Sequence, residues 1–182
     1  WPTHTALRIP FKIKNRDFML VSDEDVFRQP DYPPYPAAFL WMVDITDETR
    51  PYGVSNFHID EKAGKFCDRG GRFGAHSSHE NMTPIYHKRL AFFAWFSGGL
   101  RVVDYRNPFK MKEVAYYVPA INKNTAQRCL KVDGVNRCKI AIQTNNPEVD
   151  DRGYIYIVDR AGTGMHILEL TGDARKIANF PK

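Results

Sequence analysis

The 182-residue sequence has no long hydrophobic run and no long amphipathic helical pattern. No stretch approaches the roughly 18–20 consecutive apolar residues that a membrane-spanning helix requires. The formal net charge is +5, but the positive residues are scattered and mostly alternate with apolar ones. They do not form the basic surface, interleaved with aromatic residues, that is typical of a nucleic-acid-binding module. The sequence therefore predicts neither a membrane span nor a nucleic-acid partner.

The sequence also lacks the Gly-x-Ser-x-Gly elbow of hydrolases, and no cysteine has an obvious histidine partner, so nucleophilic hydrolase chemistry is unsupported. Only three cysteines are present. Cys129 and Cys138 flank an Asp-Gly turn signal at residues 133–134, and a hairpin there brings the two sulfur atoms together. The sequence leaves two alternatives for this pair: a disulfide or two unlinked cysteines. A disulfide would indicate an oxidising, extracytoplasmic compartment. Cys67 is left over.

The residues that are abundant favour a strand-rich globular protein. Hydrophobic residues make up 43% and charged residues 26% of the chain, which excludes a disordered protein. Aromatic residues reach 13%, an enrichment that favours strands over helices. Short apolar runs punctuated by Gly, Pro and Asp predict antiparallel meanders. The sequence thus predicts an all-β fold, with a short helix at residues 125–130 and an irregular Pro-rich loop at residues 26–37 as the exceptions.

One six-residue pattern occurs three times: apolar, variable, apolar, apolar, acidic, apolar. The copies are residues 40–45, 100–105 and 165–170. A short apolar run precedes each copy, and the acidic residue is expected to accept backbone N–H bonds in the turn that follows. The pattern predicts three repeats within one unit of 1–182, each a short antiparallel meander. Their expected bounds are 1–58, 72–120 and 138–180.

The second repeat carries a family resemblance. Its segment Gly-Leu-Arg-Val-Val-Asp at residues 99–104, followed by Pro108 and by Glu-Val at 113–114, resembles the LVIVD-repeat proteins. These are predicted β-propeller proteins of mostly uncharacterised function that are often exported. The resemblance implies that the repeats are propeller blades in an extracytoplasmic protein. Propellers close with about four to eight blades, so we expect part of a larger propeller, completed by further blades or by another copy of the chain.

Polar residues precede the first strand of each repeat, and two repeats have a histidine there. The spacing from His4 to Asp44 equals the spacing from His76 to Asp104 once the Pro-rich insertion of the first repeat is removed. Histidines at equivalent repeat positions would converge on a central channel. Imidazole is a common ligand for Zn, Cu and Fe. The sequence therefore predicts a transition-metal site that contains His4 and His76, with simple hydrogen bonding to backbone and water as the alternative.

Three further residues belong to the candidate site. His79 joins the ligands if a bulge at residues 77–78 turns it to the same side as His76. Glu80 is the candidate catalytic base, or else a further ligand or a carboxylate that orients a histidine. His58, in the segment that links the first two repeats, is a weaker metal-ligand candidate.

Two functions from different classes follow from this sequence. The first is an exported metal-binding propeller, acting as a metal-dependent oxidoreductase or lyase on an unknown substrate. The second is a non-enzymatic scaffold for protein or polysaccharide partners, with the Tyr/Pro-rich segment 30–36 as its contact element, since exposed aromatic residues and pre-ordered proline favour recognition.

Overall fold

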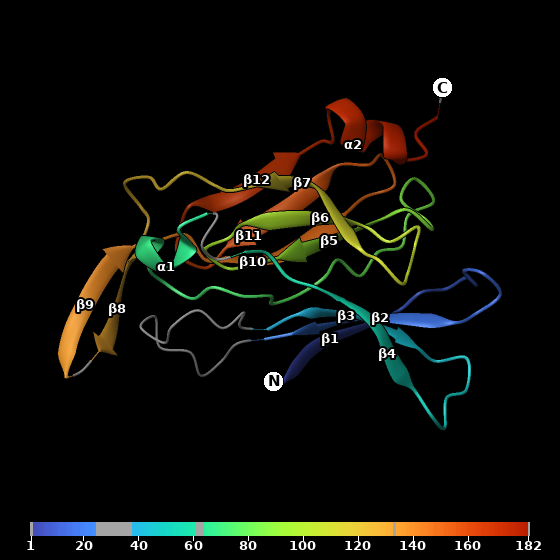
Figure 1. Cartoon of the computed structure of the whole chain (residues 1–182). Helices are drawn as coiled ribbons and strands as arrows, with labels where there is room; N and C mark the ends of the chain where they lie inside the picture. The colour runs from blue at the N-terminus through green and yellow to red at the C-terminus, as the bar shows by residue number, and fades with distance from the viewer. Residues whose placement is uncertain (1, 25–37, 61–63, 133, 182) are drawn as a thin grey trace.

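A computed structural model describes residues 2–24, 38–60, 64–132 and 134–181 (Figure 1). In this part of the chain the fold is all-β with two short helices, as predicted. The strands are β1 (Thr3–Arg8), β2 (Phe18–Asp23), β3 (Leu40–Asp44), β4 (Tyr52–Phe57), β5 (Leu90–Ala94), β6 (Leu100–Asp104), β7 (Lys112–Tyr117), β8 (Gln127–Val132), β9 (Val135–Ile140), β10 (Thr144–Val149), β11 (Ile155–Asp159) and β12 (Gly164–Leu168). The helices are α1 (Phe66–Arg69) and α2 (Gly172–Ile177). None of the helices described is long and apolar enough to cross a membrane.

The strands form three antiparallel meanders and one hairpin (Figure 1). The first sheet has the order β1-β2-β3-β4, the second β5-β6-β7 and the third β10-β11-β12. An irregular segment, residues 73–79, runs beside β5: the amides of His76 and His79 donate to the carbonyls of Ala94 and Phe92, both at 3.0 Å. This segment, which we call the inner segment, takes the place in the second sheet that β1 has in the first.

The first two sheets repeat one another in register and in their turns. Phe18 pairs with Asp44 in the first sheet, and Leu90 pairs with Asp104 in the second. Each aspartate accepts the backbone N–H of the residue two positions later at 2.9 Å, so the expected turn role of the acidic residue holds in both. In the third sheet the partner of Ile155 is Leu168. Continued by one residue, this register places Tyr154 opposite Glu169. The third copy therefore keeps the alignment of the first two, although Glu169 lies just after β12.

The second sheet lies between the other two, and successive residues of β5 show this. Phe93 belongs to a hydrophobic cluster shared with Phe18 and Leu20 of the first sheet. Phe92 belongs to a second cluster, shared with Ile155 and Ile157 of the third sheet. Adjacent residues of a strand point to opposite faces, so β5 is buried along its whole length. The three sheets thus pack face to face in chain order.

The hairpin of β8 and β9 lies between the second and third sheets in the sequence. Cys129 and Cys138 are directly opposite each other on its two strands, and they form a disulfide with an S–S distance of 2.07 Å. Of the two alternatives for these cysteines, the structure has the cross-link. The helix expected at residues 125–130 is wrong, because Gln127–Val132 pairs with β9 as a strand.

Candidate metal centre

His4 and His76 occupy matching positions in the first and second sheets. Ala6, two residues after His4, pairs with Val21. Ser78, two residues after His76, pairs with Phe93, which is the equivalent of Val21 in the second sheet. The two imidazole rings lie side by side, with their centres 4.1 Å apart and their planes at 44°. The repeat thus places two imidazole side chains, a type that can bind metal ions, at the meeting point of two sheets.

Local backbone geometry turns His4 and Glu24 toward this point. The pairing of β1 with β2 shifts register between Thr3 and Thr5, so His4 is the extra residue of a β-bulge. Such bulges re-aim a side chain that would otherwise follow the strand's alternation. Glu24 follows β2 directly and is half-buried. Ligand atoms of His4, Glu24 and His76 all lie within 4.8 Å of one another.

His76 is held in one defined orientation. Its side chain is buried, and its Nδ1 donates a hydrogen bond of 2.6 Å to the backbone carbonyl of Asn145 in the third sheet. A neutral imidazole that donates from Nδ1 presents the lone pair of Nε2. That Nε2 lies 3.6 Å from Oε1 of Glu24. Metal-binding histidines are commonly oriented by such a second hydrogen bond.

Electrostatics favour the neutral form of His76. Burial is the largest cause that lowers its pKa, and the nearby His4 and Arg160 lower it further. The Asn145 carbonyl and Glu24 act in the opposite direction, but the net shift is downward. The ring is therefore neutral, and able to bind a metal, at neutral pH.

Arg72 is the cationic neighbour of Glu24 in this structure. Its Nη2 donates to Oε1 of Glu24 at 2.8 Å, and its guanidinium lies 4.2 Å from the centre of the Phe96 ring. Both side chains are largely shielded from solvent. Arg72 thus fixes the position of the Glu24 carboxylate beside the two histidines.

The structure does not bring the other three candidates into this group. His79 is fully buried, and its Nδ1 accepts the N–H of Phe92 at 3.2 Å. Glu80 is exposed, and its amide donates to Glu148. His58 is exposed and packs edge-on against Phe39, with ring centres 5.7 Å apart. Among the described residues, none of the three lies in the cluster of ligand atoms within 4.8 Å.

The position of His79 has a simple cause. Residues three apart on an extended strand point to opposite faces, and the inner segment keeps enough strand character around Ser78 for this rule to hold. Burial lowers the pKa of His79 to about 4, so the ring is neutral in the folded protein. Its role is to fill and hydrogen-bond the interior beside β5.

Sequence reasoning missed Glu24 and the Asn145 carbonyl. Glu24 could have been found from antiparallel pairing, because a strand that begins at residue 3 and pairs with residues 18–23 places its first residues opposite the end of that strand. The carbonyl of Asn145 had no signal, since a backbone acceptor is independent of residue type. The Tyr/Pro-rich segment 30–36 lies outside the described residues.

Comparisons with known proteins do not assign this site. No protein-family model matches the chain, and no curated protein is significantly similar to it. The function is therefore inferred from the geometry and chemistry of the cluster.

Proposed function

We propose that the protein binds one divalent transition-metal ion through His4, Glu24 and His76. The observation that carries this proposal is the 3.6 Å separation between Nε2 of His76 and Oε1 of Glu24. When His76 is neutral and donates from Nδ1, both of these atoms are acceptors. Oε1 already accepts one hydrogen bond from Arg72, but a carboxylate oxygen has a second lone pair, so a cation between Oε1 and Nε2 would relieve their remaining repulsion. Ligands bound to zinc at ~2.0–2.1 Å with tetrahedral angles lie about 3.3 Å apart, close to the observed separation.

The three proposed ligands, His4, Glu24 and His76, fit a catalytic metal site better than a structural one, in which protein ligands occupy all four positions. Two histidines and one carboxylate leave a fourth position of a tetrahedral ion open to water or substrate, as in catalytic zinc sites. His4 is exposed, so this position faces solvent. A bound ion supplies Lewis-acid chemistry there, in line with an oxidoreductase or lyase whose substrate is unidentified. His76 and Glu24 serve as ligands whose positions are set by Asn145 and Arg72.

We further propose that the three sheets are blades of a β-propeller. The support is their shared register and their face-to-face packing in chain order. On the outer face of the third sheet, the side chains of Val158, Met165 and Ile167 are 42%, 61% and 56% exposed. An apolar face of this kind fits a further sheet, either another blade or one from a second copy of the chain. The disulfide is compatible with an extracytoplasmic location.

Calorimetric titration of metal-free protein with ZnCl₂ tests the metal proposal. We expect one Zn²⁺ per chain, because one cluster supplies the ligands. His58→Ala is the control: it removes an exposed histidine that lies outside the cluster, and it should leave the stoichiometry and the affinity unchanged. A Kd above about 1 mM for the unmodified chain would rule the proposal out.

A further inference from the structure

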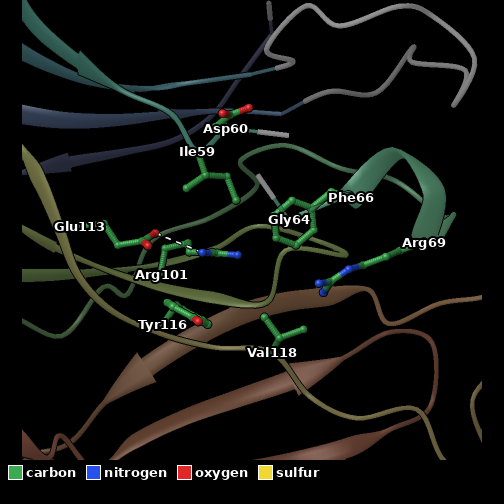
Figure 2. A pocket seen from close by; sticks show the side chains of 9 residues that line it. All are labelled: Ile59, Asp60, Gly64, Phe66, Arg69, Arg101, Glu113, Tyr116 and Val118. Atoms are coloured by element: carbon green, nitrogen blue, oxygen red, sulfur yellow. Dashed lines mark hydrogen bonds and ion pairs between the residues drawn. The ribbon is translucent and has the colours of Figure 1, made fainter. Parts of the chain in front are cut away.

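A separate pocket of about 340 Å³ lies beside α1 and the strands β6 and β7 (Figure 2). It is lined by Ile59, Asp60, Gly64, Phe66, Arg69, Arg101, Glu113, Tyr116 and Val118. It shares no residue with the His4–Glu24–His76 cluster. Its volume is at the lower end of the ~300–1,000 Å³ of small-molecule sites.

Arg101 is the charged residue at the centre of this pocket. It is only 4% exposed, although it carries a guanidinium group. Its Nε and Nη2 donate to the Gly98 carbonyl at 3.0 and 2.6 Å, and its Nη1 donates to Glu113 at 3.2 Å. A guanidinium has five N–H donors, so one N–H on each terminal nitrogen remains without a protein acceptor among the described residues.

The corresponding position of the first sheet shows that the repeat does not require this ion pair. Arg101 and Trp41 are both the second residue of their strands, β6 and β3. Glu113 likewise corresponds to Gly53, because their partners Val103 and Val43 are equivalent. The first sheet fills the space with the Trp41 ring, 3.7 Å from the position of a Cβ on Gly53. Buried ion pairs are often no more stabilising than apolar side chains of similar size. Stability alone therefore does not explain the presence of the Arg101–Glu113 pair.

A second cation faces Arg101 across the pocket. Figure 2 shows the guanidinium groups of Arg69 and Arg101 both directed toward its middle, from α1 and β6. The Phe66 ring lies near both, at 4.5 Å from Arg69 and 5.3 Å from Arg101. Burial lowers the pKa of Arg101, Glu113 raises it, and the charge of Arg69 lowers it further. An anion between the two guanidinium groups would relieve this repulsion.

We propose that this pocket binds a small organic carboxylate. Its acid group lies between Arg101 and Arg69, where the planar forks of two guanidinium groups match a carboxylate. Its apolar or ring-shaped body lies against Phe66 and Tyr116. Tyr116 is 65% exposed, and its ring lies 5.0 Å from the Arg101 guanidinium. We therefore place the entrance of the pocket beside Tyr116. Glu113 holds Arg101 in the orientation that receives the acid group.

The test is a titration of the ¹⁵N-labelled chain with sodium benzoate, followed by NMR at the backbone amides and the Arg101 Nε–H. Benzamide is the matched neutral ligand, and inorganic phosphate is the matched anion without an apolar body. We expect saturable shifts with benzoate around Phe66, Arg101 and Tyr116, and shifts at least ten times smaller with benzamide at the same concentration. Phosphate should bind more weakly than benzoate.

The variant for this test is Arg69→Gln, because Arg69 is exposed and its loss leaves the interior intact. It should weaken benzoate binding about tenfold or more, whereas Arg50→Gln, which changes an exposed arginine outside the pocket, should not alter it. The proposal is overturned if benzoate gives no saturable shift, if benzamide binds equally well, or if Arg69→Gln binds benzoate like the unmodified chain. Phosphate binding without benzoate binding would also overturn it.

Discussion

Replacing His76 with Ala is expected to weaken Zn²⁺ binding by about 100-fold or more. The substitution removes a ligand whose orientation is fixed by the hydrogen bond that it donates to the third sheet. Loss of a residue that merely orients a ligand already costs about 10–100-fold in metal affinity, so loss of the ligand itself should cost at least as much. The measurement is the Zn²⁺ dissociation constant from competition with a chromophoric chelator at pH 7.5.

His76→Ala also changes the folded protein, so a second variant separates binding from stability. The alanine removes one of two donors to the Asn145 carbonyl, which still accepts the Ser77 hydroxyl at 2.7 Å. The lost hydrogen bond itself should therefore cost about 0.5–1.5 kcal/mol of unfolding free energy. Glu24→Gln keeps the size and shape of the side chain, removes its negative charge and replaces one acceptor oxygen by an NH₂ group. It should still weaken Zn²⁺ binding by about tenfold or more. Unchanged zinc affinity in both variants, with the fold intact, would contradict the site.

The unfolding free energy should fall by about 3 kcal/mol between pH 7 and pH 4 because of His79 alone. The pKa of this histidine is about 4 in the folded protein and about 6.5 when unfolded. Between these values the unfolded state binds more protons, so stability is fully present above pH 6.5 and is lost as the pH falls toward 4. Denaturant unfolding at several pH values measures the loss.

His79→Gln isolates this contribution, because glutamine does not titrate, and any loss of the hydrogen bond from the Phe92 N–H lowers stability equally at every pH. We expect the variant to have a flatter dependence of unfolding free energy on pH in this window. His166→Gln is the control, because His166 is only half-buried and lies on β12. An identical pH dependence in His79→Gln and in the unmodified chain would show that His79 is not held neutral.

Much of the fold was predictable because it depends on local patterns. Alternating apolar residues and turn residues indicated the meanders, and the recurring acidic residue indicated the turns that Asp44 and Asp104 close. The Asp-Gly turn indicated the hairpin that joins Cys129 to Cys138, although not whether they are linked. The helix expected at residues 125–130 failed because strand pairing with β9, a tertiary contact, overrides weak local helix preference.

The repeat made two residues of the candidate site predictable. His4 and His76 occupy matching positions in two repeats, and this alone predicted that they lie together, as they do. Nothing in the sequence indicated a function for Arg101, because it occupies the second position of the six-residue pattern, where the residue type varies among the copies. Its burial becomes visible only when β7 and α1 close the pocket around it.

X-ray absorption at the zinc K-edge, on protein loaded with one equivalent of Zn²⁺, tests the central claim most directly. We predict two imidazole nitrogens and one carboxylate oxygen at ~2.0–2.2 Å, from His76, His4 and Glu24. The Glu24→Gln variant should lose the carboxylate contribution, and His4→Ala should lose one imidazole. A spectrum with fewer than two imidazoles, or one that neither variant changes, would contradict the account.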